Sequence, residues 1–305
     1  MPGRSARGLL HLLLVAACAA LVACHAGNEE AKRLRVACDG GDFKACNTLA
    51  VKLQKGEYVL QDDLRAAALF DQACTGGVAN GCASLGVVYQ RGSGVKRDST
   101  RAVALFRQGC DGGAMDGCTR LGVLYRQGAG VARDLPRAVT LLDQACKGDD
   151  VAGCAHLGTL YAAGEGVPQD VDRAAGLFQR SCTKEIALGC LGLGRLTAAG
   201  TGVARDDSVA AALFDQSCKG GDTDGCVERA AMFEAGLGVE QNYQRAANLY
   251  RNACEDRHGE ACARLALLYD KGAGVPRIPD QAATLRRRAC SYGYTDACEK
   301  PKAAA

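Results

Sequence analysis

The cysteines form a regular set of pairs, and they are the residues whose type and spacing most directly suggest chemistry. From Cys38 onward they come in pairs eight residues apart, and each pair recurs 36 residues later. Thiols in such pairs could form disulfides, bind a metal ion or exchange electrons. A disulfide within each pair would require the chain to reverse direction, because eight residues along one helix span ~12 Å, whereas bridged Cα atoms lie ~4.4–6.8 Å apart. The pairs are Cys38 and Cys46, Cys74 and Cys82, Cys110 and Cys118, Cys146 and Cys154, Cys182 and Cys190, Cys218 and Cys226, Cys254 and Cys262, and Cys290 and Cys298.

One S-x-x-K motif, from Ser181 to Lys184, is a weak candidate for nucleophilic catalysis. On a helix it places a lysine one turn from a serine, as in serine β-lactamases and penicillin-binding proteins. The usual companion motifs, S-D-N and K-T-G, are absent from the chain. Ser181 also aligns with Ala145 and Ala253 of other repeats, so a chance match is the simpler interpretation. We therefore expect no catalytic residue and keep Ser181 and Lys184 only as weak candidates.

Other catalytic and cofactor sites find little support. His156 and His258 lie about three repeats apart, and no G-x-x-x-x-G-K-[ST] loop is present. The chain carries 37 basic and 34 acidic residues and no tryptophan. Without a basic run interleaved with aromatic residues, nucleic-acid binding is not expected. We expect no cofactor and no metal site.

The segments between cysteine pairs read as helical hairpins. Seven complete units run from the second cysteine of one pair to the first cysteine of the next. In the unit from Cys118 to Cys146, a first helix ends at Gly128, and Asp134 is placed to cap a second helix. The expected apolar positions of the two helices are Leu121, Gly122, Leu124 and Tyr125, then Ala138, Leu141 and Leu142. A repeat of 36 residues predicts an α-solenoid.

The N-terminus predicts export. Arg4 and Arg7 precede an apolar stretch, residues 9–22, of the length typical of a secretory signal. The stretch ends in Leu-Val-Ala followed by Cys24, which resembles the lipobox of bacterial lipoproteins; an ordinary signal peptide or a signal anchor is the alternative. Cysteine pairing favours an oxidising compartment. We predict a lipoprotein signal over 1–23, lipidation at Cys24 with a tether over 24–33, repeats over 34–300, and a tail over 301–305.

The recurring pattern A-x-x-L-G-x-x-Y-x-x-G-x-G-V-x-x-D-x-x-x-A-x-x-L-F-x-x-A-C resembles the Sel-one-like repeat, a relative of the tetratricopeptide repeat. The cysteine pair in every unit resembles one branch of that family, the Helicobacter cysteine-rich proteins. The resemblance implies a right-handed α-solenoid of seven 36-residue hairpins with half-helix caps, in which each disulfide clamps two antiparallel helices. Zinc would need four ligands per metal, and a redox relay would need one privileged thiol, so structural disulfides are preferred. The branch is also associated with penicillin binding and weak β-lactamase activity.

A variable stripe on the first helix of each hairpin is the predicted partner surface. It consists of Ser84, Arg91, Arg120, Gln127, His156, Thr159, Arg195, Glu228, Arg264 and Lys271. Arg120, Arg195 and Arg264 are the expected anchors for an acidic or carboxylate-bearing partner, with His156 and Glu228 beside them; a solvated face without a ligand is the alternative. The sequence thus predicts a lipid-anchored scaffold in the periplasm or outer membrane that binds a protein or peptide on its concave face. A β-lactamase-like hydrolase and a secreted effector are the other hypotheses.

Overall fold

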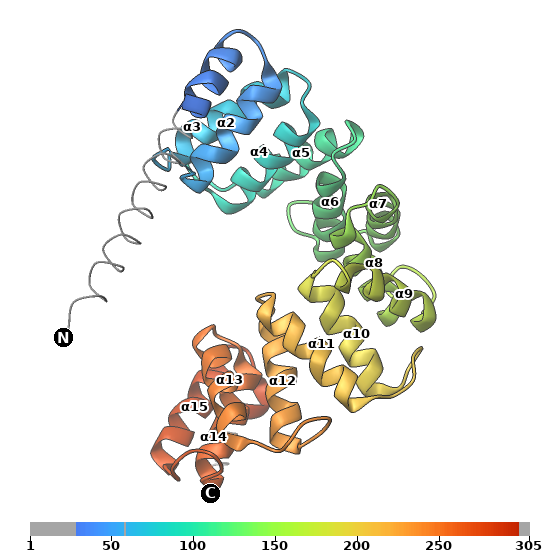
Figure 1. The fold of residues 1–305 in the computed structure, drawn as a ribbon, viewed down its shortest axis with the longest axis vertical. Coiled ribbons are helices and arrows are strands. Elements are labelled where there is room, and N and C mark those ends of the chain that lie inside the picture. The colour runs from blue at the N-terminus through green and yellow to red at the C-terminus, as the bar shows by residue number, and fades with distance from the viewer. Residues whose placement is uncertain (1–28, 58, 299–305) are drawn as a thin grey trace, which may run out of the picture. The chain divides into compact units, whose positions relative to one another are not determined.

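The computed structural model describes residues 29–57 and 59–298, and this part of the chain is helical, with no β-strand (Figure 1). The first helices of the seven hairpins are α2 (Phe43–Lys55), α4 (Ala79–Arg91), α6 (Met115–Gln127), α8 (Val151–Ala163), α10 (Ala187–Ala199), α12 (Thr223–Ala235) and α14 (Gly259–Lys271). The second helices are α3 (Asp63–Thr75), α5 (Ser99–Asp111), α7 (Leu135–Lys147), α9 (Val171–Cys182), α11 (Asp207–Lys219), α13 (Tyr243–Glu255) and α15 (Pro279–Ser291). The predicted fold class, an all-α array of seven αα-hairpins, is confirmed.

In the hairpin of α6 and α7, local signals end the first helix and begin the second where the sequence predicts. Gly128 follows α6 in the left-handed conformation, at φ 70°, and its N–H donates to the carbonyl of Leu124. A side chain would be strained in that conformation, which explains why glycine holds this position in all seven hairpins. At the start of α7, the Asp134 carboxylate accepts the N–H of Arg137 at 3.0 Å. Each hairpin is therefore specified by its own sequence.

The chain divides into two compact units, with the boundary between Gln144 and Ala145 in α7. The core of the first unit includes Leu49, Phe70 and Leu85, which are nearly inaccessible to solvent. The core of the second unit includes Tyr250 and Leu265. One alanine of each second helix has no exposed surface, as expected where two helices cross closely. These alanines are Ala66, Ala102, Ala138, Ala174, Ala210, Ala246 and Ala282.

All eight predicted cysteine pairs form disulfides, with bridged Cα atoms between 4.4 and 4.9 Å apart. Cys182 ends α9 and Cys190 lies in α10, so this bridge joins the second helix of one hairpin to the first helix of the next. The chain reverses direction between the two cysteines, as the spacing requires. Eight disulfides indicate an oxidising compartment. The other bridges join Cys38 to Cys46, Cys74 to Cys82, Cys110 to Cys118, Cys146 to Cys154, Cys218 to Cys226, Cys254 to Cys262, and Cys290 to Cys298.

A second glycine in each hairpin turn permits contact between successive repeats. A Cβ on Gly94 would lie 2.5 Å from the backbone of Asp63, at the start of the preceding second helix. Gly202 meets the backbone of Val171 in the same way, at 2.8 Å. At these glycines the turn packs directly on the backbone of the preceding second helix, so a larger residue would separate the two repeats.

The ends of the described chain carry partial repeats. Residues 29–39 form a helix that precedes the first hairpin and begins within the stretch 24–33 predicted as a tether. At the other end, a 3₁₀ helix over Thr295–Ala297 is followed by Cys298. Cys24 and the predicted signal lie outside the described residues. Among the helices that are described, none is both long and apolar enough to cross a membrane.

Candidate functional site

The predicted partner surface follows the first helices of both units. In the first unit, Arg120 of α6 lies 3.8 Å from the Asp116 carboxylate and 6.0 Å from the centre of the Phe106 ring. Its guanidinium therefore covers an aromatic side chain of α5. Arg120 is half exposed and is the one predicted arginine anchor in this unit.

In the second unit, an apolar hollow of about 250 Å³ opens between α8 and α10. It lies on the surface formed by the first helices of the hairpins, which we call the first-helix face. Phe178 of α9 contributes to its wall and is itself almost fully buried. Residues with small or apolar side chains form most of the remaining lining, and Arg195 is its one charged member. We call this feature the Gly192 hollow; its lining is Thr159, Ala162, Ala163, Phe178, Leu188, Leu191, Gly192, Arg195 and Leu196.

Two departures from the repeat pattern explain why the hollow is found at this point. Gly192 stands where other first helices have a side chain, such as Arg120, which covers the ring of Phe106. A Cβ on Gly192 would lie 2.5 Å from the ring of Phe178, so the ring fills the space that a side chain would need. Leu188 is a bulky apolar residue at a position that is otherwise polar or alanine. Those equivalents are Lys44, Asn80, Asp116, Ala152, Asp224 and Glu260.

A charged cluster adjoins the hollow and shares Arg195 with it. Arg195 of α10 reaches the Glu228 carboxylate at 2.8 Å and the Asp224 carboxylate at 3.4 Å, both on α12. Burial lowers the pKa of Arg195, but the hydrogen bond to Glu228 and the charges of both acids outweigh it and raise the pKa. The guanidinium is held by carboxylates of its own chain. The cluster lines a small recess formed by Arg195, Asp224, Val227, Glu228, Ala231, His258, Glu260 and Arg264.

The cluster continues to α14 through His258 and Arg264. His258 Nδ1 accepts the Ala261 N–H at 3.2 Å, and Nε2 lies 3.0 Å from Asp224. A neutral ring with its proton on Nε2 satisfies both contacts. Arg264 lies 2.9 Å from Glu260 and 3.9 Å from Glu234.

The charged cluster has a net negative charge. Arg195 and Arg264 provide two positive charges, whereas Asp224, Glu228 and Glu260 provide three negative charges. Glu234 adds a fourth carboxylate behind Arg264, and its other contact is the hydroxyl of Tyr250, 2.9 Å away.

The S-x-x-K motif has a structural explanation. Ser181 has no exposed surface, and its hydroxyl donates to the carbonyls of Leu177 and Phe178, each at 3.0 Å. It packs against α10, since a Cβ on Gly189 would meet Ser181 Oγ at 2.1 Å. Lys184 is exposed in the following turn. A hydroxyl enclosed in this way has no path to a substrate carbonyl, and the motif supplies no geometry for hydrolysis.

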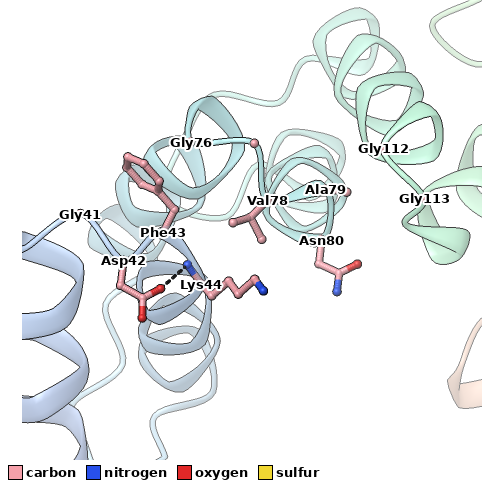
Figure 2. A pocket seen from close by; sticks show the side chains of 11 residues that line it. Gly41, Asp42, Phe43, Lys44, Gly76, Val78, Ala79, Asn80, Gly112 and Gly113 are labelled. Carbon is pink, nitrogen blue, oxygen red and sulfur yellow. Dashed lines mark hydrogen bonds between the residues drawn. The ribbon is translucent and has the colours of Figure 1, made fainter.

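A larger, open hollow of about 550 Å³ lies in the first unit, along the turns that connect successive hairpins (Figure 2). Five of its eleven lining residues are turn glycines, among them Gly41, Gly76 and Gly112. The Phe43 ring lies against Gly76, where an added Cβ would meet it at 2.0 Å. Asp42 caps α2 by accepting the Lys44 N–H at 3.0 Å, the contact dashed in Figure 2. The hollow thus follows from stacked turns and presents few side chains for chemistry.

Comparison with known proteins decides the family. The Sel1 repeat profile matches seven consecutive segments: 44–78, 79–113, 116–150, 151–185, 187–222, 223–258 and 259–293. The chain belongs to the Sel1 repeat family. Sel1 repeat proteins are scaffolds for protein interaction. None of the curated proteins compared matches the chain.

Solved structures of Sel1 repeat proteins are similar to this one. A protective antigen with this fold from uropathogenic Escherichia coli, c5321, has a TM-score of 0.64 and 26% identity over 88% of this chain; the match spans 57% of that protein. A Sel1 repeat protein from Oxalobacter formigenes has a TM-score of 0.62 and 24% identity, covering 88% of this chain and 78% of that one. Helicobacter pylori cysteine-rich protein B is 27% identical over 42% of this chain and 96% of its own, with a TM-score of 0.36.

The structure brings together three of the five residues predicted to bind a partner. Arg195, Glu228 and Arg264 line one recess, whereas Arg120 is in the other unit. His156 lies on α8, half buried, and is not among the residues lining the recess or the Gly192 hollow. The sequence did not predict the hollow, the acids Asp224 and Glu260, or the ion pair between Arg195 and Glu228. The signal for the hollow was present in the aligned repeats: Gly192 is the one glycine in a polar column, and Leu188 is the one large apolar residue in a column of polar residues and one alanine.

Proposed function

We propose that this Sel1 repeat protein is an exported, lipid-anchored scaffold of the cell envelope that binds a protein or peptide partner on the first-helix face. The observation that carries the binding proposal is the Gly192 hollow beside the charged cluster. The two features share Arg195 and combine an apolar recess with surrounding polar groups. Binding sites commonly have this composition. Membership of a family of protein-interaction scaffolds supports the same conclusion.

The envelope location is proposed from the N-terminal sequence and the disulfides. Eight bridges are consistent with folding outside the reducing cytosol, in the periplasm or at the outer membrane. Cys24 would carry the lipid, which would be the protein's contact with the membrane. The test is the intact mass of protein recovered from membranes, with a Cys24→Ser variant as control. A mass that lacks acyl chains would refute anchoring while leaving the binding proposal standing.

The binding proposal is tested by photo-crosslinking in intact cells. A photoreactive residue is placed at Gln127 or Lys271, both exposed on first helices, or at the control positions Gln179 and Val209, exposed on second helices. We expect discrete protein adducts from the first-helix positions and none from the controls. Adducts confined to the control positions, or no adduct at any position, would contradict binding on the first-helix face.

The hydrolase alternative gains no support from the buried Ser181. Nitrocefin turnover by the purified protein is its direct test, with Ser181→Ala as the matched variant. We expect no turnover above that of the variant. Turnover that disappears in Ser181→Ala would establish the hydrolase and displace the scaffold proposal.

A further inference from the structure

We propose that the Gly192 hollow receives one bulky apolar side chain of a partner segment, and that the charged cluster binds a lysine or arginine next to it. This inference rests on the proposed function and specifies the chemistry of its partner. The occupant is thus a peptide segment in which an aromatic or branched aliphatic residue adjoins a basic residue. Three observations support it.

The first observation is the size and lining of the hollow. Its volume of about 250 Å³ exceeds the ~150 Å³ of an engineered protein cavity that binds benzene. Phe178, Leu188 and Leu191 line it, so an apolar side chain would exchange water for apolar contacts. Arg195 is its one ionisable lining residue and is already paired with Glu228 and Asp224. The hollow therefore suits an uncharged group.

The second observation is that the hollow departs from the repeat pattern. The Arg120 guanidinium covers Phe106 in the first unit, whereas Gly192 places no side chain over Phe178 at the equivalent position. Leu188 adds apolar surface at the same site, at a position where Asp224 and Glu260 stand in the next two repeats. Two changes in one helix act in the same direction, which is toward an open apolar surface.

The third observation is charge complementarity. Each guanidinium of the cluster is within 3 Å of a carboxylate of this chain, Arg195 with Glu228 and Arg264 with Glu260. Asp224 and Glu234 remain as additional acids, so the cluster has more negative than positive charge. An incoming ammonium or guanidinium group would be attracted to this surplus, whereas a carboxylate would be repelled. The pairing thus favours a basic segment over the acidic partner expected from the arginines alone.

The test uses defined peptides and the absence of tryptophan from the protein. Two blocked heptapeptides, Gly-Ser-Lys-Trp-Lys-Ser-Gly and Gly-Ser-Glu-Trp-Glu-Ser-Gly, are titrated with the full-length mature protein. Excitation at 295 nm then reports the peptide tryptophan, whose emission shifts to shorter wavelength when the ring enters an apolar site. We expect the lysine peptide to bind with a blue shift and the glutamate peptide to bind at least fivefold more weakly.

Variants locate the binding. Ala163→Leu, at an exposed residue lining the hollow, should weaken the lysine peptide at least tenfold. Ala199→Leu, at the equivalent exposed residue one repeat further on, is the matched control and should leave binding unchanged. Glu260→Gln should weaken the lysine peptide and reduce its advantage over the glutamate peptide. Circular dichroism of each variant verifies that it is folded.

Other outcomes separate this inference from the proposed function. Equal effects of Ala163→Leu and Ala199→Leu, or tighter binding of the glutamate peptide, would overturn the inference but not the crosslinking result on the first-helix face. A tryptophan emission that shifts with neither peptide would also overturn the inference. Crosslinking confined to second-helix controls would instead contradict the proposed function.

Discussion

Replacing Ser217 with alanine should stabilise the protein, although it removes a hydroxyl. Ser217 has no exposed surface, and its Oγ has no hydrogen-bond partner. A Cβ on Gly225 would lie 2.4 Å from that oxygen, so the hydroxyl is pressed against the next helix. Burying a hydroxyl without a partner costs about 1–3 kcal/mol. The free energy of unfolding should therefore rise by about 1 kcal/mol or more.

Ser181 provides the matched control, because it occupies the same position one repeat earlier. Its hydroxyl donates to Leu177 and Phe178, so Ser181→Ala should lower the free energy of unfolding by about 0.5–1.5 kcal/mol. Urea unfolding followed by far-UV circular dichroism, with disulfides intact, measures both variants. Opposite signs are the expected result. A loss of stability in Ser217→Ala equal to that in Ser181→Ala would show that the two hydroxyls have similar environments and refute the reasoning.

Three further predictions concern one of the disulfides, the buried phenol of Tyr250 and the strained turn at Arg257. The double variant Cys182→Ala with Cys190→Ala should lower the free energy of unfolding by about 2.5 kcal/mol, because the unfolded chain regains the entropy of the open loop. Hydrogen exchange should rise in α9 and α10 and their neighbours, and unchanged exchange there would contradict a local effect of the disulfide. Burial and a neighbouring carboxylate raise the pKa of Tyr250, so the stability that the neutral phenol contributes below about pH 10 should decline as the pH rises further. The urea midpoint should therefore fall less in Tyr250→Phe than in the unmodified protein between about pH 9.5 and 11.5. An equal fall in both proteins would contradict a raised pKa of Tyr250. Arg257 adopts φ 66°, so Arg257→Gly should stabilise the protein by up to about 1 kcal/mol. Gly221 occupies the equivalent position at φ 87°, so Gly221→Arg should destabilise the protein by about 1–2 kcal/mol. A calorimetric stability change of the same sign in both variants would be inconsistent with backbone strain.

The hairpins could be predicted because each boundary depends on residues close by in the sequence. Gly128 ends α6 through its own conformation, and Asp134 caps α7 through a contact three residues away. The disulfides were predictable for a related reason: the eight-residue spacing leaves few geometries once the chain turns between Cys182 and Cys190. None of these features depends on a distant part of the chain.

The aromatic positions were predicted only in part: their burial was expected, but their contacts with arginines of the neighbouring helix were not. Tyr125 was predicted to be a core residue, and it is buried. The arginine above it was not predicted: the Arg137 guanidinium lies 5.0 Å from the ring centre. The same pairing recurs between Arg101 and Tyr89, at 4.3 Å. Such pairs join the two helices of a hairpin, so they are visible only when the columns of both helices are compared.

The site was less predictable because its properties arise from side chains on several helices. Arg195 was correctly placed on the first-helix face, but its carboxylate partners come from α12, about 30 residues away. A free arginine attracts a carboxylate, whereas one already paired within an acidic surplus does not. Position on a face could be inferred from the repeat, but net local charge required the neighbouring helix.

A repeat protein contains its own controls, and this favours a functional interpretation of α10. The hairpin of α10 and α11 departs from the pattern at Leu188 and Gly192, and also at Thr197, which replaces the aromatic ring, and at Val209, which replaces the arginine above it. Thr197 compensates locally, since it is buried and its hydroxyl donates to the Leu193 carbonyl at 2.8 Å. Gly192 leaves room for the Phe178 ring, but glycine lowers helix stability and the hollow beside the ring stays unfilled. A position that lowers stability and opens an apolar surface is more readily explained by a partner than by folding.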